Sequence, residues 1–407
     1  MLFDTYEVIE GTDLSKWLLE ELIPKLHSSL PIAIAGRNKI FPIKSKIAIP
    51  IKVDKFDLEE TKALIIKRYT DTGAELDLTE IQIEKIYQLT EGRPILVNLS
   101  IDWLLENAKI DELIEENITE NDFSEKLVSW IRNLDSELEI TIIYMAIINR
   151  RFNYEILSYL RKLSASESKR ILQQLSRFSF IKYRALSQSY QLHDEMGEMV
   201  QAIGYQGRLR NDIIEDVIKC YHQLISNATS LQEKQTYSIE QLYYQLLIDV
   251  EEGLRSFSYL FEQALDLGQL DYCKVLLDQV EKKSVQNAPS RDIINISRAE
   301  LEIELFELNN ATEILEMLVS KYEQLGTKGN SFKARCFVDL SKIHKFQGEY
   351  QHAIKKLEDS LKIYKEIGNR EQINRVLLET GEIYYLMAQY GKAQTQLEMI
   401  SPQQVKR

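Results

Sequence analysis

The distribution of helix-breaking residues is the feature that most constrains this sequence. Five of the seven prolines lie at positions 24, 31, 42, 50 and 94, and the next is Pro289. No glycine lies between Gly92 and Gly197. Because proline and glycine destabilise helix interiors, long stretches without them favour helix. The pattern predicts a short α/β beginning followed by a long, mainly α body.

Composition excludes several classes of function. The 407 residues carry 50 Lys and Arg against 63 Asp and Glu, a net charge of −13, which argues against binding nucleic acid or anionic membrane along the whole chain. No run of 18 apolar residues and no signal-peptide pattern occurs, so we expect no membrane association. Three dispersed cysteines favour a reducing, cytoplasmic location, and the five histidines predict no metal site.

Residues 1–55 have the pattern of a parallel βαβ unit. Apolar runs lie at 1–3, 31–35 and 47–51, and a helical pattern over 14–30 lies between the first two. Two or three strands are too few for a complete doubly wound sheet. We therefore expect a partial α/β domain, with an unpaired strand edge and an exposed apolar face.

Residues 56–122 predict a small helical unit and an acidic linker. Asp57, with Glu60 three residues later, is typical of a capping box that starts a helix. Thr79 precedes a second helical pattern, and Pro94 suits the first position of a third helix.

Residues 123–205 predict a winged helix. Helical patterns cover 134–148, 154–162 and 166–175, and two strand-like runs follow at 180–184 and 190–193. The five residues between the runs suit a hairpin turn.

Residues 206–407 contain a repeat. Tyr350 and Ala353 recur as Tyr390 and Ala393, a shift of 40 residues, and fainter copies lie upstream. This period predicts a helical solenoid of tetratricopeptide type, in which small residues let paired helices pack closely. The repeat signature comprises Gly348, Tyr350, Ala353, Gly381, Tyr384, Tyr390 and Ala393.

Short motifs precede the repeats in a recognisable order: Leu2-Phe3-Asp4 with Glu7, Gly36-Arg37, Gly92-Arg93-Pro94 and Leu192-His193-Asp194. In this order they resemble the STAND class of signal-transduction P-loop ATPases (NB-ARC- and NACHT-like). The resemblance covers residues 1 to about 205 as an ATPase remnant and 206–407 as a sensor array. It implies a mainly α fold: partial α/β P-loop ATPase remnant, small helical unit, winged helix, then α-solenoid.

The resemblance implies roles at the start of the chain. Asp4 would hold Mg²⁺ through water as a Walker B acid, and Glu7 would orient the attacking water. Arg37 would sense the γ-phosphate, for which a planar, always charged guanidinium is suited. The alternatives are two solvated acids at a strand end and a surface-loop arginine.

The resemblance also implies nucleotide contacts further along. Pro94 would pack against adenine, Gly92 would allow close approach, and His193 would contact the β-phosphate of ADP. The alternatives are ordinary helix punctuation at Gly92 and Pro94, and a cap at Asp194 for a helix that starts at Glu195.

One large departure concerns catalysis. No G-x-x-x-x-G-K-[ST] occurs in the sequence, so the phosphate cradle and its lysine are missing from this chain. Phosphoryl transfer depends on positioning and charge neutralisation. We therefore predict no ATP hydrolysis by the chain alone. ATP or ADP and Mg²⁺ are expected as cofactors only of an intact member of the class.

Three functional hypotheses follow. The leading one is a signalling scaffold whose repeats bind a protein or peptide ligand on their concave face. Tyr243, Tyr244 and Tyr384 are candidate contacts, although aromatic residues at helical spacing more often belong to the core. A second is a transcription regulator that reads DNA through its winged helix. Residues 123–205 hold 11 basic and 9 acidic residues, and the candidate recognition residues are Lys169, Arg170 and Arg177. A third is an ATPase whose P-loop is supplied upstream or by another chain.

Overall fold

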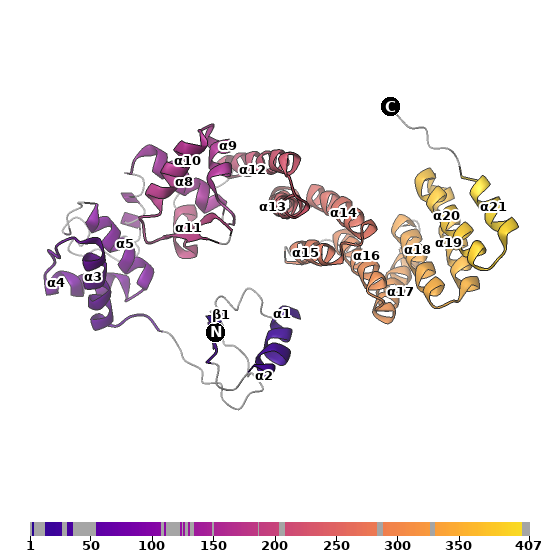
Figure 1. The fold of residues 1–407 in the computed structure, drawn as a ribbon, viewed down its shortest axis with the longest axis horizontal. Helices are drawn as coiled ribbons and strands as arrows, with labels where there is room; N and C mark the ends of the chain where they lie inside the picture. The colour runs from indigo at the N-terminus through magenta and orange to yellow at the C-terminus, as the bar shows by residue number, and fades with distance from the viewer. Residues whose placement is uncertain are drawn as a thin grey trace. The chain divides into compact units, whose positions relative to one another are not determined.

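The computed structural model of the chain is mainly helical (Figure 1). It describes residues 2–3, 13–26, 31–35, 54–106, 134–148, 150–185, 187–202, 208–282, 288–325 and 330–400, with a few isolated positions between 110 and 130. The backbone forms two compact units, Met1–Val97 and Asn98–Arg407, which divide inside helix α5 (Pro94–Leu105). The domain boundaries given above stay predictions.

The first unit contains the expected parallel strand pair. In β1 (Leu2–Phe3) and β2 (Ala33–Ile34), Leu2 lies opposite Ala33 and Phe3 opposite Ile34. The connection contains α1 (Asp13–Lys16), the π-helical turn η2 (Trp17–Leu22) and α2 (Ile23–Lys25). This continuous helical segment, 13–25, is shorter than the predicted helix over 14–30. Its Leu18 is buried, whereas Trp17 is 47% exposed. The expected third strand, 47–51, lies outside the described residues.

Helices α3 (Leu58–Thr72), α4 (Glu80–Thr90) and α5 begin where their capping residues predict. Glu60 N donates to Asp57 Oδ1 at 2.8 Å and Asp57 N donates to Glu60 Oε2 at 3.0 Å, which confirms the capping box. Thr79 and Gln82 form the same arrangement at α4. Such reciprocal bonds satisfy backbone donors that a helix start leaves open.

Three helices and a hairpin form the arrangement of a winged helix within the second unit. The helices are α8 (Ser136–Ile147), α9 (Tyr154–Arg161) and α10 (Ala165–Leu175). Strands β3 (Ile181–Arg184) and β4 (Ser189–Leu192) pair antiparallel, and Phe152 adds a bridge to Tyr190. Helix α11 (Asp194–Ala202) follows.

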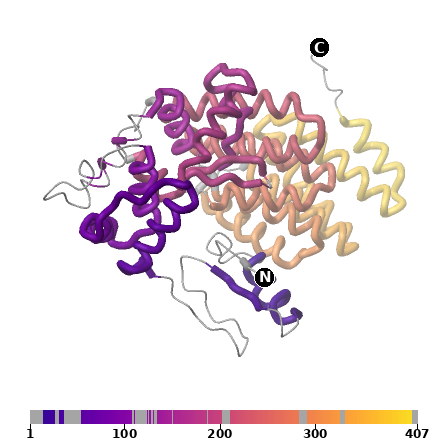
Figure 2. Tube along the Cα trace, turned by 60° about the vertical axis from the view of Figure 1, so that its left-hand side comes forward, coloured from indigo at the N-terminus to yellow at the C-terminus, as the bar shows by residue number. Residues whose placement is uncertain are grey.

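Pairs of helices then succeed one another to residue 398, stacked in chain order (Figure 2). The pairs are α12 (Arg208–Asn227) with α13 (Leu231–Ile248), α14 (Val250–Asp266) with α15 (Leu270–Glu281), α16 (Ala288–Glu304) with α17 (Leu308–Gln324), α18 (Asn330–Phe346) with α19 (Tyr350–Ile367), and α20 (Arg370–Leu386) with α21 (Tyr390–Glu398). The predicted helical solenoid is confirmed.

Small buried residues mark the same position in the later pairs. Cys273, Ala311, Ala353 and Ala393 each occupy the fourth position of the second helix in their pair, and all four are buried. A small side chain there lets the two helices approach closely. The repeat period in the sequence therefore arises from the packing of paired helices.

Candidate functional site

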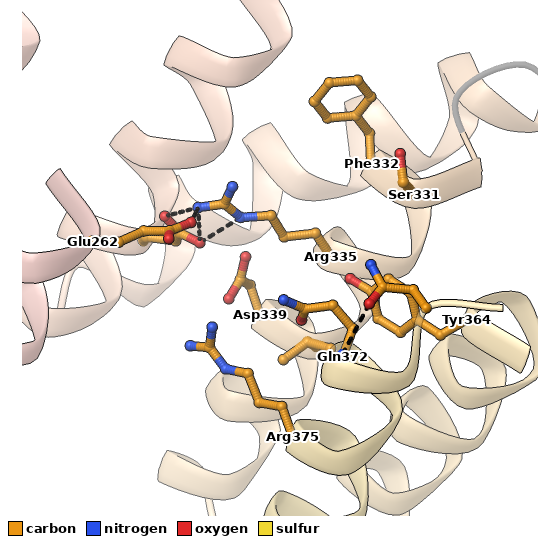
Figure 3. Close-up of a pocket in the computed structure, with 11 residues that line it drawn as sticks. Glu262, Ser331, Phe332, Arg335, Asp339, Tyr364, Gln372 and Arg375 are labelled. Atoms are coloured by element: carbon orange, nitrogen blue, oxygen red, sulfur yellow. Dashed lines mark hydrogen bonds and ion pairs between the residues drawn. The ribbon is translucent and has the colours of Figure 1, made fainter. Parts of the chain in front are cut away.

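A pocket of about 200 Å³ lies among the first helices of successive repeats. Its walls come from α14, α16, α18 and α20, with Tyr364 contributed by α19 (Figure 3). Its polar lining residues include three acids and two arginines: Glu262, Glu300, Asp339, Arg335 and Arg375. A pocket lined by so many charged groups favours a polar or charged ligand.

Arg335 fastens three helices together in the pocket wall. Its Nε and Nη2 each lie 2.8 Å from a carboxylate oxygen of Glu300, a bidentate pair, and Nη2 lies 3.2 Å from Glu262 Oε1. Burial opposes the ionisation of Arg335, but the charge and hydrogen bonds of Glu300 outweigh it, so the pKa of Arg335 is raised. This guanidinium is engaged within the protein.

Asp339 is buried at the pocket with only half of its carboxylate satisfied. Its Oδ1 accepts from Lys342 Nζ at 3.2 Å, whereas Oδ2 has no hydrogen-bond partner among the described residues. Burial raises the pKa of Asp339 to about 6; the charge of Lys342 opposes this and that of Glu300 adds to it. An unpartnered buried oxygen is costly, and a ligand donor would remove that cost.

The remaining polar groups of the pocket also have unused hydrogen-bonding capacity. Arg375 is exposed and makes no hydrogen bond or ion pair with another described residue, and the same holds for the side chain of Gln372. Burial, and secondarily the charge of Asp339, raises the pKa of Tyr364 to about 12, so its hydroxyl is neutral at physiological pH. The pocket thus offers a guanidinium, an amide, a phenol and a carboxylate oxygen.

The sequence reasoning missed this pocket, although a signal existed. Arg335 and Arg375 are separated by 40 residues, the same shift that relates Tyr350 to Tyr390. Each is the sixth residue of the first helix in its pair. A charged residue recurring at one repeat position on the first helices is the pattern that could have identified the lining.

The Walker-B-like residues Asp4 and Glu7, and Arg37, lie outside the described residues. Gly92 and Pro94 belong to the first unit. Gly92 has φ +66°, its carbonyl accepts from Phe56 N at 2.9 Å, and Pro94 is the first residue of α5. This geometry is that of a helix boundary, and the nucleotide contact stays a prediction.

His193 belongs to the second unit, between β4 and α11. Its backbone N donates to Phe180 O, and its carbonyl accepts from Gly197 N, both at 2.8 Å. Helix α11 begins at Asp194, one residue earlier than the start predicted at Glu195, because the His193 carbonyl already accepts the first helical bond. The role of His193 toward a phosphate is untested.

The repeat-signature residues serve packing and turn geometry. Gly348 has φ +76° in the turn before Tyr350, and a Cβ on Gly381 would lie 3.3 Å from Leu397 Cδ2. Ala353 and Ala393 are buried, whereas Tyr390 is exposed.

Of the three tyrosines considered as ligand contacts, Tyr244 is a core residue. It is fully buried and stacked 6.0 Å from the Tyr221 ring, which rules out a ligand contact and confirms the core alternative for Tyr244. Tyr243 packs under the Arg150 guanidinium at 4.3 Å, and Tyr384 lies under Lys392 at 5.3 Å. None of the three lines the pocket.

Of the candidate DNA-reading side chains, Lys169 and Arg170 of α10 have partners within the protein, and Arg177 follows the end of that helix. Lys169 Nζ lies 4.4 Å from the Tyr154 ring centroid, and Arg170 bonds Glu137 at 3.1 Å and Gln174 at 3.3 Å. Arg177 is exposed. These contacts compete with phosphate binding, so they do not favour the DNA hypothesis.

Two other kinds of site were searched for in the described residues. No group of three or more His, Cys, Asp or Glu there could hold a metal ion. Within the same residues, no helix is both long and apolar enough to cross a membrane.

Similarity to known proteins is found among solved structures. No protein family and no curated protein matches the sequence. Among solved structures, the chain is similar to the Signal Transduction ATPase with Numerous Domains (STAND) protein with a tetratricopeptide repeat sensor from Pyrococcus horikoshii, with 16% sequence identity and a TM-score of 0.44. The match covers 98% of this chain and 61% of that one, so this chain spans less than two thirds of its length.

Proposed function

We propose that this chain acts in signalling, as the sensor-bearing part of a STAND-type switch, and that its repeats bind a protein or peptide ligand. One observation carries the proposal: the charged pocket on successive first helices, where Asp339 and Arg375 have unused hydrogen-bonding capacity. Repeat proteins commonly recognise ligands across several adjacent repeats. The proposed setting is the cytoplasm.

The proposed switch has two states. In a complete protein of this class, ligand binding on the repeats would bias the winged helix between an ADP-bound closed state and an ATP-bound open state. Such a bias requires that the ligand bind one state more tightly than the other. The sequence given lacks the P-loop pattern, so the proposed role of this chain by itself is binding and not catalysis.

A selection experiment tests the proposal. The purified full chain is used as bait for a displayed library of random linear peptides, and the affinities of enriched peptides are measured by calorimetry. We expect enriched peptides that lose at least tenfold in affinity for Arg375→Ala. The matched control is Arg370→Ala, which removes an exposed arginine of the same helix outside the pocket.

Two outcomes would contradict the proposal. One is the absence of any enriched peptide. The other is a set of peptides whose affinity is the same for the wild type, Arg375→Ala and Arg370→Ala, which would place the binding surface elsewhere.

A further inference from the structure

We infer that the ligand of the repeat pocket presents a cationic nitrogen, a lysine or arginine side chain or a peptide amino terminus, to the free oxygen of Asp339. This inference rests on the proposed function and specifies the chemistry that the pocket recognises. Asp339 is buried with one unpartnered oxygen, and no neighbouring cation donates to that oxygen.

Asp339 is the unusual group in the pocket. Its side chain is 2% exposed, and Oδ2 has no hydrogen-bond partner among the described residues. In Figure 3 its carboxylate is drawn between the side chains of Arg335 and Arg375, within the pocket that these residues line. A buried acceptor without a donor is rare, and it indicates a position for a donor that arrives from outside.

None of the neighbouring cations donates to Oδ2 of Asp339. Arg335 is held by two bonds to Glu300 and a third contact to Glu262, and Lys342 meets only Oδ1 of Asp339. Arg375 has no ion pair with any described residue. Because Arg335 and Lys342 are held in these contacts, Oδ2 keeps an open acceptor site.

The open acceptor at Asp339 favours a cation over an anion, although Lys342 on Oδ1 brings the cations around the pocket to the same number as the acids. Three carboxylates and two guanidinium groups line the pocket, and the one arginine without an ion pair is exposed and therefore solvated. An incoming ammonium or guanidinium would gain an ion pair in a buried place, where charges attract more strongly than in water. An anion would gain only the exposed Arg375.

The volume limits what can enter. About 200 Å³ accommodates one extended side chain or one chain terminus, and not a folded surface. Gln372, Tyr364 and Arg375 line the same space, so they can donate to the backbone carbonyls that flank the inserted group. A basic residue within an otherwise neutral linear segment fits this combination.

The same peptide selection tests the inference, with the full chain as bait. We expect peptides enriched by the wild type to share a lysine or arginine at one position. Replacing that residue by norleucine should lower the affinity for the wild type at least tenfold and leave the affinity for Asp339→Asn unchanged. The control is Asp359→Asn, which neutralises an exposed acid outside the pocket and should behave as the wild type.

A second measurement uses the wild type alone, so its result does not depend on whether the Asp339→Asn variant folds. Affinity of the wild type for the basic peptide should fall severalfold when the pH is lowered from 7.5 to 5, because protonated Asp339 no longer attracts a cation. The charged or titratable groups around Asp339 are Glu262, Glu300, Arg335, Cys336, Lys342, Tyr364 and Arg375. Peptides in which norleucine replaces the basic residue should show no such fall.

Each result has a distinct meaning. Enriched peptides that need Arg375 but share no basic residue would overturn the inference and leave the proposed function standing. Equal loss from norleucine substitution on the wild type and on Asp339→Asn would do the same. If no peptide is enriched, both the proposed function and the inference fall.

Discussion

Arg150 Nη2 lies 3.2 Å from Glu240 Oε1, and this ion pair joins the segment before α9 of the winged helix to α13 of the repeats. Arg151 Nε approaches the same oxygen at 3.8 Å, and Arg150 also donates to Gln279 at 2.9 Å. Glu240 is almost wholly buried. The winged helix and the first repeats are thus linked by a buried carboxylate.

We predict that the two simplest changes at Glu240 differ sharply. Burial raises the pKa of Glu240 although Arg150 and Arg151 oppose it, so the site tolerates a neutral isostere. Glu240→Gln keeps an acceptor for Arg150 and should change stability by no more than about 1 kcal/mol, whereas Glu240→Ala should cost about 3–5 kcal/mol by leaving a cavity and removing that acceptor. Hydrogen exchange in α9 and α13 measures the difference.

The control for Glu240 is an exposed ion pair. Glu252 pairs with Arg255 at 2.9 Å, and both side chains are more than half exposed. Glu252→Ala should cost no more than about 1 kcal/mol. Equal losses from Glu240→Ala and Glu252→Ala would contradict a structural role for the buried pair.

Replacing either of two glycines that have left-handed backbones by alanine should lower stability by different amounts. Gly73 (φ +71°) has nothing within 4 Å of an added Cβ, whereas a Cβ on Gly92 (φ +66°) would lie 1.9 Å from Phe56 O. Gly73→Ala should cost about 1–2 kcal/mol, the ordinary cost of this conformation, and Gly92→Ala should cost several kcal/mol more. Hydrogen exchange in α3 and α4 tests this, and similar protection in the two variants would refute the clash.

Phe306 occupies a turn position that other repeats give to small residues. Its φ is +60°, and the matching turn residues are Gly268, Gly348 and Ala388. Phe306→Gly should stabilise the turn by about 1 kcal/mol through relief of backbone strain, and Gly348→Ala should destabilise its own turn by a similar amount. Urea unfolding of the three proteins gives the comparison.

A loss of stability in Phe306→Gly would contradict the prediction that relief of backbone strain stabilises the turn. The ring of Phe306 lies 5.3 Å from that of Phe346, and both are exposed. In that case this aromatic contact would contribute more than the left-handed backbone costs.

Asp339 should make stability depend on pH. Its pKa of about 6 in the folded protein lies above the value of about 3.9 in an unfolded chain. Its contribution, about 3 kcal/mol, is therefore fully present below about pH 3.9 and is lost as the pH rises through about 6. Asp339→Asn should lack this dependence, so its melting midpoint relative to the wild type should be highest at pH 8. A difference that is constant from pH 5 to pH 8 would contradict the prediction.

The chain alone should not hydrolyse ATP. The purified chain should show no turnover of Mg-ATP in a phosphate-release assay, because the sequence given contains no lysine-bearing phosphate cradle. Turnover in stoichiometric excess over the protein that disappears in Asp4→Asn would refute it. The variant distinguishes the chain's own activity from a contaminating ATPase.

Local features were predictable because their causes lie within a few residues. The capping box of Asp57 and Glu60 and the start of α5 at Pro94 were confirmed at the expected positions. The hairpin of β3 and β4 and the helix pairs with a period near 40 were confirmed too. The position of Tyr244 was left open between ligand contact and core, because periodicity does not distinguish a helix face that binds a ligand from one that enters the core.

The sequence by itself determined the helical body, the helix boundaries and the repeat period, since these follow from propensity, capping and the spacing of small residues. Only the tertiary structure decided which charges meet. Glu300 and Arg335 are 35 residues apart, and their bidentate pair forms only because α16 and α18 pack side by side. Asp339 becomes a candidate site for the same reason: burial and an unsatisfied oxygen are properties of the packed helices.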